Sequence, residues 1–305
     1  MSRNLDAAQA VGLPVAGRQA GRRWTSFKRA WYRFSRQRVS VVGLVLVVAA
    51  IVLAIFAPWI VPYPEHAGAY VDFSQASHPP SVQHWFGTDI VGRDVMSRGV
   101  FALRGALIMA IGVIGIVVPI GVLWGLVAGY NAGTKIDTIL MRTADVFLAL
   151  PALVLALAVC AILKPTLFNA MLAVCVSWWP WYARLAYGMA SSQRNETYVS
   201  AAQIIGAGRG HIMFREILPN CLSPVFTKMA LDVGWVILIG SALSFVGLGE
   251  QPPTPALGTM LADGSKYLPE LWWLAVFPAA TIVVLVLAFN LLGDGIRDAL
   301  APEEA

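Results

Sequence analysis

The sequence predicts an all-α, polytopic membrane protein with six transmembrane helices. Of its 305 residues, 58% are hydrophobic and 13% are charged, whereas a soluble domain carries about 25% charged residues. Several uncharged apolar runs approach or exceed the roughly 20 residues that cross a bilayer as a helix. Lys and Arg also gather on alternate connectors, as the orientation rule for membrane proteins requires. These three observations place the chain in a membrane.

The six expected spans differ in clarity. The runs at 39–61, 105–128 and 271–292 are uninterrupted, and 167–183 is a good fourth. Two shorter runs, 146–163 and 233–248, reach full length when extended back toward Asp137 and through Lys228 and Asp232. Lys228 and Asp232 are four residues apart, so they can neutralise each other on one helix face.

The distribution of basic residues predicts the orientation. Many of them gather before the first span, among them Arg18, Arg22, Arg23, Lys28, Arg29, Arg33, Arg36 and Arg38. A cytoplasmic N-terminus follows, and with six spans the connectors 129–143 and 184–222 and the C-terminal tail, 294–305, are cytoplasmic too. The net charge of +5 is therefore an orientation signal, and no nucleic-acid partner is expected.

Residues 1–38 form a basic tail ahead of the first transmembrane helix, 39–61. Aromatic residues recur in this tail at helical spacing: Trp24, Phe27, Trp31 and Phe34. With Lys and Arg between them, they predict a helix lying on the cytoplasmic leaflet. A disordered basic tail is the alternative.

The segment 62–101 lies outside the membrane in this orientation. Its second half, His84–Arg98, alternates Asp89, Arg93 and Asp94 with apolar residues and leads straight into the second span, which predicts an ordered surface. The segment also holds three histidines: His66, His78 and His84. A metal site there is conceivable, but the irregular spacing favours solvated loop histidines.

The core, 102–293, contains one unusual connector, 195–222, which keeps helical periodicity. Ala201 and Ala202 combine high helix propensity with little bulk, which would let a partner approach closely. Gly206 and Gly208 allow a sharp turn. The connector therefore predicts a helix-turn-helix docking element, with an amphipathic connector resting on lipid as the alternative.

The second arm of this element is expected to be a short helix, His211–Ile217, which presents Ile212, Met213 and Phe214 as apolar contacts, with Arg215 and Glu216 beside them. Pro219 is then expected to end it, and Pro224 to start the next span.

Motifs for catalysis are absent from the sequence. It contains no G-x-x-x-x-G-K-[ST], G-x-S-x-G or H-E-x-x-H, so nucleotide hydrolysis and the commoner hydrolase chemistries are not expected in this polypeptide. A stand-alone channel or secondary transporter would need midplane charges or paired broken helices, and a membrane enzyme would need a nucleophile or metal constellation. The sequence shows none of these features, so the energy for any transport would come from another subunit.

The connector resembles the EAA-type loop of permease subunits from bacterial ABC importers, E-A-A-x3-G-x9-I-x-L-P. The matching positions are Ser200, Ala201, Ala202, Gly206, Leu218 and Pro219. Two positions depart from the pattern: Ser200 replaces the Glu, and Glu216 replaces the Ile, which follows at Ile217. Loss of the Glu puts in doubt any salt bridge carried over to that site.

Three further blocks resemble the dipeptide, oligopeptide and nickel branch of these importers. The first block, at 84–98, reads HWFGTDIVGRDVMSR and matches a block that precedes the permease core. The second, at 247–261, reads GLGEQPPTPALGTML and matches a later block, with Leu257 where Trp is usual. The third, at 288–302, reads AFNLLGDGIRDALAP and matches the C-terminal signature. The chain most resembles the second permease of a dipeptide importer.

The resemblance implies a type-1 ABC importer transmembrane domain in the bacterial inner membrane. Its partners would be a homologous second permease, two cytoplasmic ATPases that bind ATP and Mg, and a periplasmic or lipid-anchored solute-binding protein. This chain would hold no cofactor. The implied ATPase-coupling residues are Ser200, Ala201, Ala202, Gly206, Gly208, Phe214, Arg215, Leu218 and Pro219. The implied periplasmic assembly block comprises Asp89, Arg93 and Asp94.

The substrate path is not defined by the sequence. Four polar residues in or near spans are candidates by polarity alone: Asn169, Ser177, Ser241 and Asn290. Hydrogen bonds between helices are an equally good explanation for them. Dipeptides, longer peptides, nickel chelates and other small solutes all remain open as substrates.

Overall fold

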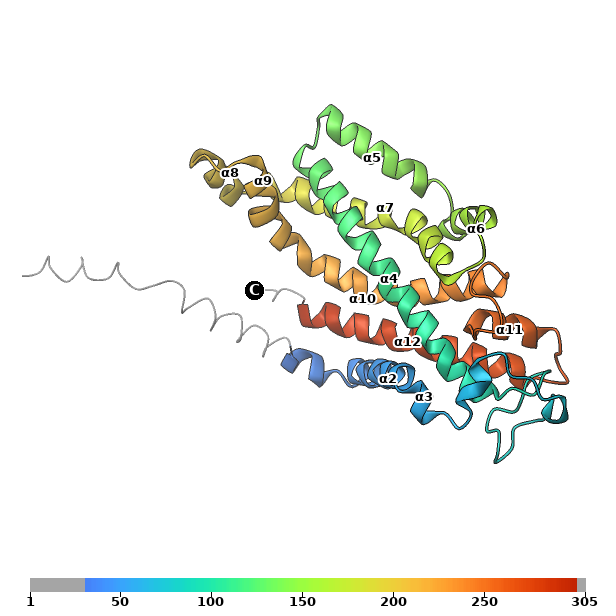
Figure 1. Ribbon diagram of the computed structural model, residues 1–305. Helices are drawn as coiled ribbons and strands as arrows, with labels where there is room; N and C mark the ends of the chain where they lie inside the picture. The colour runs from blue at the N-terminus through green and yellow to red at the C-terminus, as the bar shows by residue number, and fades with distance from the viewer. Residues whose placement is uncertain (1–30, 301–305) are drawn as a thin grey trace, which may run out of the picture.

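The computed structural model describes residues 31–300 as a bundle of long helices joined by short helical turns (Figure 1). Within that range the only strand-like pairing is a single bridge between Thr88 and Asp94. The helices, in chain order, are α2 (Arg38–Ile55), α3 (Ala57–Ile60), α4 (Val95–Tyr130), α5 (Lys135–Leu148), α6 (Ala152–Ile162), α7 (Leu167–Gln193), α8 (Thr197–Ile204), α9 (Arg209–His211), α10 (Leu218–Phe245), α11 (Leu257–Ser265) and α12 (Trp273–Leu300). The all-helical prediction is confirmed.

The described residues contain four helices long and apolar enough to cross a membrane, rather than the expected six. They are α2, α4, the helix that ends with α10, and α12. α5 and α6 give a fifth if they are taken as one span bent by 83°, and the break falls at Pro151, which cannot continue a helix. α7 is 27 residues long, but Trp and Pro residues interrupt its apolar run at 178–181. Six spans are reached only if α7 counts as one span and the bent pair of α5 and α6 counts as another.

Several expected boundaries are wrong. α2 ends at Ile55 and the first span bends into α3. α4 begins at Val95, so residues 95–101 are already helical. The Asp94 carboxylate accepts from the Ser97 N–H at 2.7 Å, and this N-cap starts α4 early. α12 continues to Leu300, through half of the expected tail, 294–305.

The bundle is organised around α4, which packs along α7 through glycines four residues apart. Added β-carbons at Gly121, Gly125 and Gly129 would meet the backbone of α7. Small residues at this spacing let two helices approach closely in a membrane. The two helices therefore form a tight pair, which α10 and α12 flank (Figure 1).

The N-terminal arm is helical at 31–36 and packs partly against its own chain. Trp31 is exposed, as an interfacial helix requires, but Phe34 is buried. It lies against Gly295 of α12, so the expectation of a fully lipid-facing aromatic stripe is wrong at this position. Trp24 and Phe27 lie outside the described residues.

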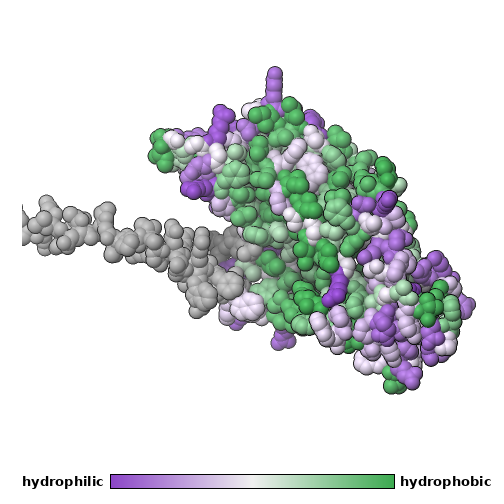
Figure 2. All heavy atoms as spheres, viewed as in Figure 1, coloured by the Kyte–Doolittle hydropathy of each residue, from purple (hydrophilic) through white to green (hydrophobic). Residues whose placement is uncertain are grey.

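The surface divides into an apolar middle and polar ends. Figure 2 shows hydrophobic residues across the middle of the visible face, with hydrophilic residues gathered toward the end that carries α11 and the 62–94 segment. This distribution is what a bilayer around the bundle requires.

Candidate functional site

The segment 195–222 projects from one end of the bundle as α8, a tight turn and a second helix (Figure 1). At the turn, the Gly206 N–H donates to the Gln203 carbonyl at 3.0 Å and the Ala207 N–H to the Ala202 carbonyl at 2.9 Å. These two bonds, with Gly206 at φ +83°, form a Schellman motif that closes the helix. The predicted turn at Gly206 is confirmed.

The prediction that Pro219 ends the second arm is wrong. The chain runs from α9 through a π-helical turn, Ile212–Ile217, straight into α10. A π-helical turn bonds to the fifth residue back. This wider turn accommodates Pro219, which lacks an N–H and would clash with the carbonyl four residues earlier in a regular α-helix. The arm is therefore continuous with the next span.

The inner face of the segment has its own hydrophobic core. It comprises Leu126, Ala190, Val199, Ala202, Ile212, Ile217 and Cys221. These residues come from the ends of α4 and α7, from α8, from the π-helical turn and from the start of α10. A force on α8 would thus reach three long helices through one packed core.

The outer face carries exposed apolar side chains at the turn. Ile204 is 86% exposed, Ile205 84% and Phe214 47%. Of these three, only Phe214 was expected, as an apolar contact of the second arm. The same expectation is wrong for Ile212, which is 1% exposed and packs in the inner core. The two adjacent apolar residues just before Gly206 were a signal that the motif comparison passed over.

The predicted coupling residues divide between the two faces. Seven are exposed: Ser200, Ala201, Gly206, Gly208, Phe214, Arg215 and Pro219. Leu218 is partly buried against the core. Ala202 is only 8% exposed, so the expectation that it faces a partner is wrong, because its small side chain packs inside its own chain.

Polar side chains tie the segment to the bundle at positions that the sequence did not single out. The Arg194 guanidinium donates to the Ala132 carbonyl at 2.7 Å and to the Tyr130 carbonyl at 3.2 Å. The Asn220 amide donates to the Tyr198 hydroxyl at 3.2 Å. The first contact joins the ends of α7 and α4, and the second joins the two arms of the segment.

The predicted outer block is ordered by its own side chains. Arg93 Nε lies 2.7 Å from Asp89 Oδ2, and the backbone N–H groups of Val91 and Arg93 donate to Asp89 Oδ1. Asp94 is 1% exposed and caps α4. The ordering role is thus visible within the chain, and most of each side chain is turned inward.

Two of the three outer histidines are buried, so the expectation of solvated histidines is wrong for His66 and His84. His84 Nδ1 lies 3.0 Å from Asp94 Oδ1, and the Asp94 N–H donates to His66 Nδ1 at 2.8 Å. Burial is the main cause that lowers the pKa of His66. His78 is exposed, as expected. Among the described residues, no group of three or more His, Cys, Asp or Glu is placed to hold a metal.

The candidate path residues make local contacts and do not meet at one point. The Ser177 hydroxyl donates to the Val174 carbonyl at 2.9 Å, and the Asn169 amide to the Lys164 carbonyl at 2.9 Å. Ser241 lines a pocket, described below. Asn290 faces Gly234 across α10 and α12.

The expected Lys228–Asp232 pair is confirmed at 3.1 Å. The indole N–H of Trp178 on α7 also donates to Asp232 at 3.0 Å. This contact joins the two spans on either side of the 195–222 segment.

These features define a helical membrane protein with a helix-turn-helix segment projecting from one end of its bundle. The chain belongs to the family of binding-protein-dependent transport system inner membrane components, which matches residues 121–304. The N-terminal transmembrane domain of oligopeptide transport permease C matches residues 25–80. The chain is thus a multi-pass inner-membrane permease component.

Three relatives from Escherichia coli illustrate the similarity. The dipeptide transport system permease protein DppC of strain K12 is 43% identical, covering 92% of this chain and 94% of its own. The probable D,D-dipeptide transport system permease protein DdpC of the same strain is 41% identical, covering 87% and 88%. The glutathione transport system permease protein GsiD of strain 536 is 40% identical, covering 92% and 91%.

Proposed function

We propose that this chain is one of two permease subunits of an ATP-driven importer for dipeptides and related small peptides. Separate ATPases bind the 195–222 segment from the cytoplasm, and a solute-binding protein delivers the peptide from the periplasm. ATP and Mg are bound by the ATPases, and this chain holds no cofactor. Nickel complexes and other small solutes are the alternative substrates.

The exposed apolar turn of the segment supports docking of an ATPase. Ile204 and Ile205 leave most of their surface in solvent, which costs free energy unless a partner covers them.

The packing beneath the turn supports a lever mechanism. Closure of the ATPases on ATP moves the docked segment as a rigid body. The core that includes Val199, Ile212 and Ile217 transmits the movement to α4, α7 and α10. Nucleotide binding thereby shifts the population between two packings of the spans.

Peptide substrates are supported by the relatives. Two of the three are named for dipeptides or D,D-dipeptides and the third for glutathione. These compounds share a short backbone with charged groups, so one path of suitable width and polarity could serve all of them.

The docking surface is tested with the double variant Ile204→Asp/Ile205→Asp in the complete importer. We expect it to insert normally, to lose co-purification of the ATPases and to lose uptake of radiolabelled dialanine, because two charges replace the apolar contact. Val82→Asp is the matched control, since Val82 is 92% exposed in the outer segment. Full ATPase capture and full uptake by the double variant would contradict the docking assignment.

A further inference from the structure

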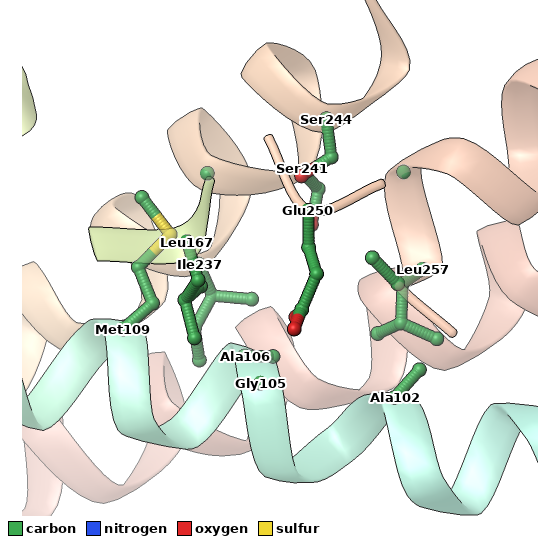
Figure 3. Close-up of a pocket in the computed structure, with 13 residues that line it drawn as sticks. Ala102, Gly105, Ala106, Met109, Leu167, Ile237, Ser241, Ser244, Glu250 and Leu257 are labelled. Atoms are coloured by element: carbon green, nitrogen blue, oxygen red, sulfur yellow. The ribbon is translucent and has the colours of Figure 1, made fainter. Parts of the chain in front are cut away.

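A small pocket lies between α4, α10 and α11, near the end of the bundle that carries the outer block (Figure 3). Glu250, in the loop between α10 and α11, points into it toward α4. The cavity has a volume of about 30 Å³, above the roughly 10–15 Å³ that one water molecule needs on this measure. A small polar group therefore fits in it.

The backbone around Glu250 is fixed by its neighbours. The Gln251 amide donates to the carbonyls of Gly247 at 3.0 Å and Gly249 at 3.1 Å. On the opposite wall, a β-carbon at Gly105 would lie 3.3 Å from Glu250 Oε2. The carboxylate is therefore held against α4 at a position where a small residue leaves room for it.

Among the residues that the structure describes, no hydrogen bond or ion pair reaches the Glu250 carboxylate, nor the hydroxyls of Ser241 and Ser244 that line the same pocket. Partial burial raises the pKa of Glu250, as expected for a carboxylate that loses part of its contact with water and has no counter-ion in the described part of the chain. A cation beside the carboxylate would offset this cost.

We propose that this pocket, the Glu250 pocket, is a subsite for the free α-amino group of the transported peptide. An ammonium group donates three hydrogen bonds and is close to water in size. Met109, Leu167 and Leu257 line the rest of the pocket and can contact the aliphatic carbon next to the amine. The inference rests on the proposed peptide substrate and the proposed orientation, in which this end meets the periplasm.

The test compares two substrates in vesicles that contain the complete importer with saturating binding protein. Dialanine carries the amino group, and N-propionyl-alanine is the same molecule without it. We expect Glu250→Gln to reduce the ratio of dialanine to N-propionyl-alanine uptake about tenfold, because a charge-assisted hydrogen bond is lost. Glu250→Asp, which keeps the charge, should retain most of the ratio. Any preference of the binding protein for one compound is the same in every vesicle, so it cancels when the uptake ratio of a variant is compared with that of the wild type.

Glu270→Gln is the matched control, because Glu270 is an exposed glutamate on the same side, and it should leave the ratio unchanged. An unchanged ratio in Glu250→Gln would overturn the subsite. So would an equal slowing of both substrates, which would assign Glu250 to packing or to an ion pair with the second permease. Wild-type vesicles that import neither compound would instead refute the peptide assignment, which separates the two failures.

Discussion

Gly206 carries the turn of the docking segment through its backbone conformation and not through lack of space. Its φ is +83°, and an added β-carbon would meet nothing within 4 Å. A left-handed conformation costs a residue with a side chain about 1–2 kcal/mol. Gly206→Ala should therefore destabilise the segment by about this amount, seen as a lower thermal midpoint and reduced uptake.

Gly208 provides the control for this prediction. Its φ is −70°, and its β-carbon would also meet nothing within 4 Å. Gly208→Ala should cost little. Equal losses in the two alanine variants would show that bulk at the docking surface, and not the turn, is what Gly206 provides.

His66 gives the outer block a predictable response to acid. Its Nδ1 accepts the Asp94 N–H, so protonation breaks this bond. Burial lowers its pKa in the folded protein below the ordinary 6.5, so the unfolded chain binds the proton more readily. The free energy of unfolding of the block should therefore fall as the pH drops from about 6.5 toward the folded pKa. Hydrogen exchange of the Asp94 amide between pH 7 and pH 5 measures this loss.

The charged groups around His66 set the size of the effect. Glu65, Asp94 and Asp89 favour the proton, and His84 opposes it. His66→Gln keeps an acceptor but does not titrate, so it should flatten the pH dependence, whereas His78→Gln, at an exposed position, should not. An unchanged pH dependence in His66→Gln would assign the response to another group.

At the scale of single residues, contacts between residues close in the chain were predictable from the sequence, and the burial of side chains was not. The sequence predicted the turn at Gly206 and the Lys228–Asp232 pair, because both depend on residues close in the chain. It misjudged Ala202, His66 and His84, whose surroundings come from segments distant in sequence.

At the scale of elements, the tight pairing of α4 with α7 depends on glycines. Gly125 packs directly against Ala183 and Ala186, so a β-carbon there would clash with the partner helix. Gly125→Ala should destabilise the detergent-purified protein by about 1–3 kcal/mol, since overpacking forces the helices apart. Gly188, exposed on α7 with nothing within 4 Å of its β-carbon, is the control, and Gly188→Ala should be neutral or stabilising. A loss of the same size in both variants would argue against the close approach.

Helix existence was predictable from hydropathy, but helix ends and breaks were less so. Apolar runs marked α2, α4, α10 and α12 well. The early start of α4 depends on the Asp94 cap, and the passage through Pro219 depends on a π-helical turn. The bend at Pro151 was a missed local signal, because a proline inside an apolar run predicts a break.

At the scale of the whole molecule, the predicted orientation places the 195–222 segment in the cytoplasm and the 62–94 segment outside. The three cysteines are buried, so cysteines introduced at exposed positions report the sidedness against a low background. Val82 is 92% exposed in the outer segment, and Ser192 is exposed at the end of α7, next to the docking segment.

In spheroplasts, a membrane-impermeant maleimide should label Val82→Cys at once and Ser192→Cys only after the membrane is permeabilised. The physical reason is the excess of Lys and Arg before the first span and in the 184–222 connector, which is retained on the cytoplasmic side. Labelling in the reverse order would show that the bundle has the opposite orientation in the membrane. It would then place the Glu250 pocket at the cytoplasmic face, where an incoming peptide would meet it last.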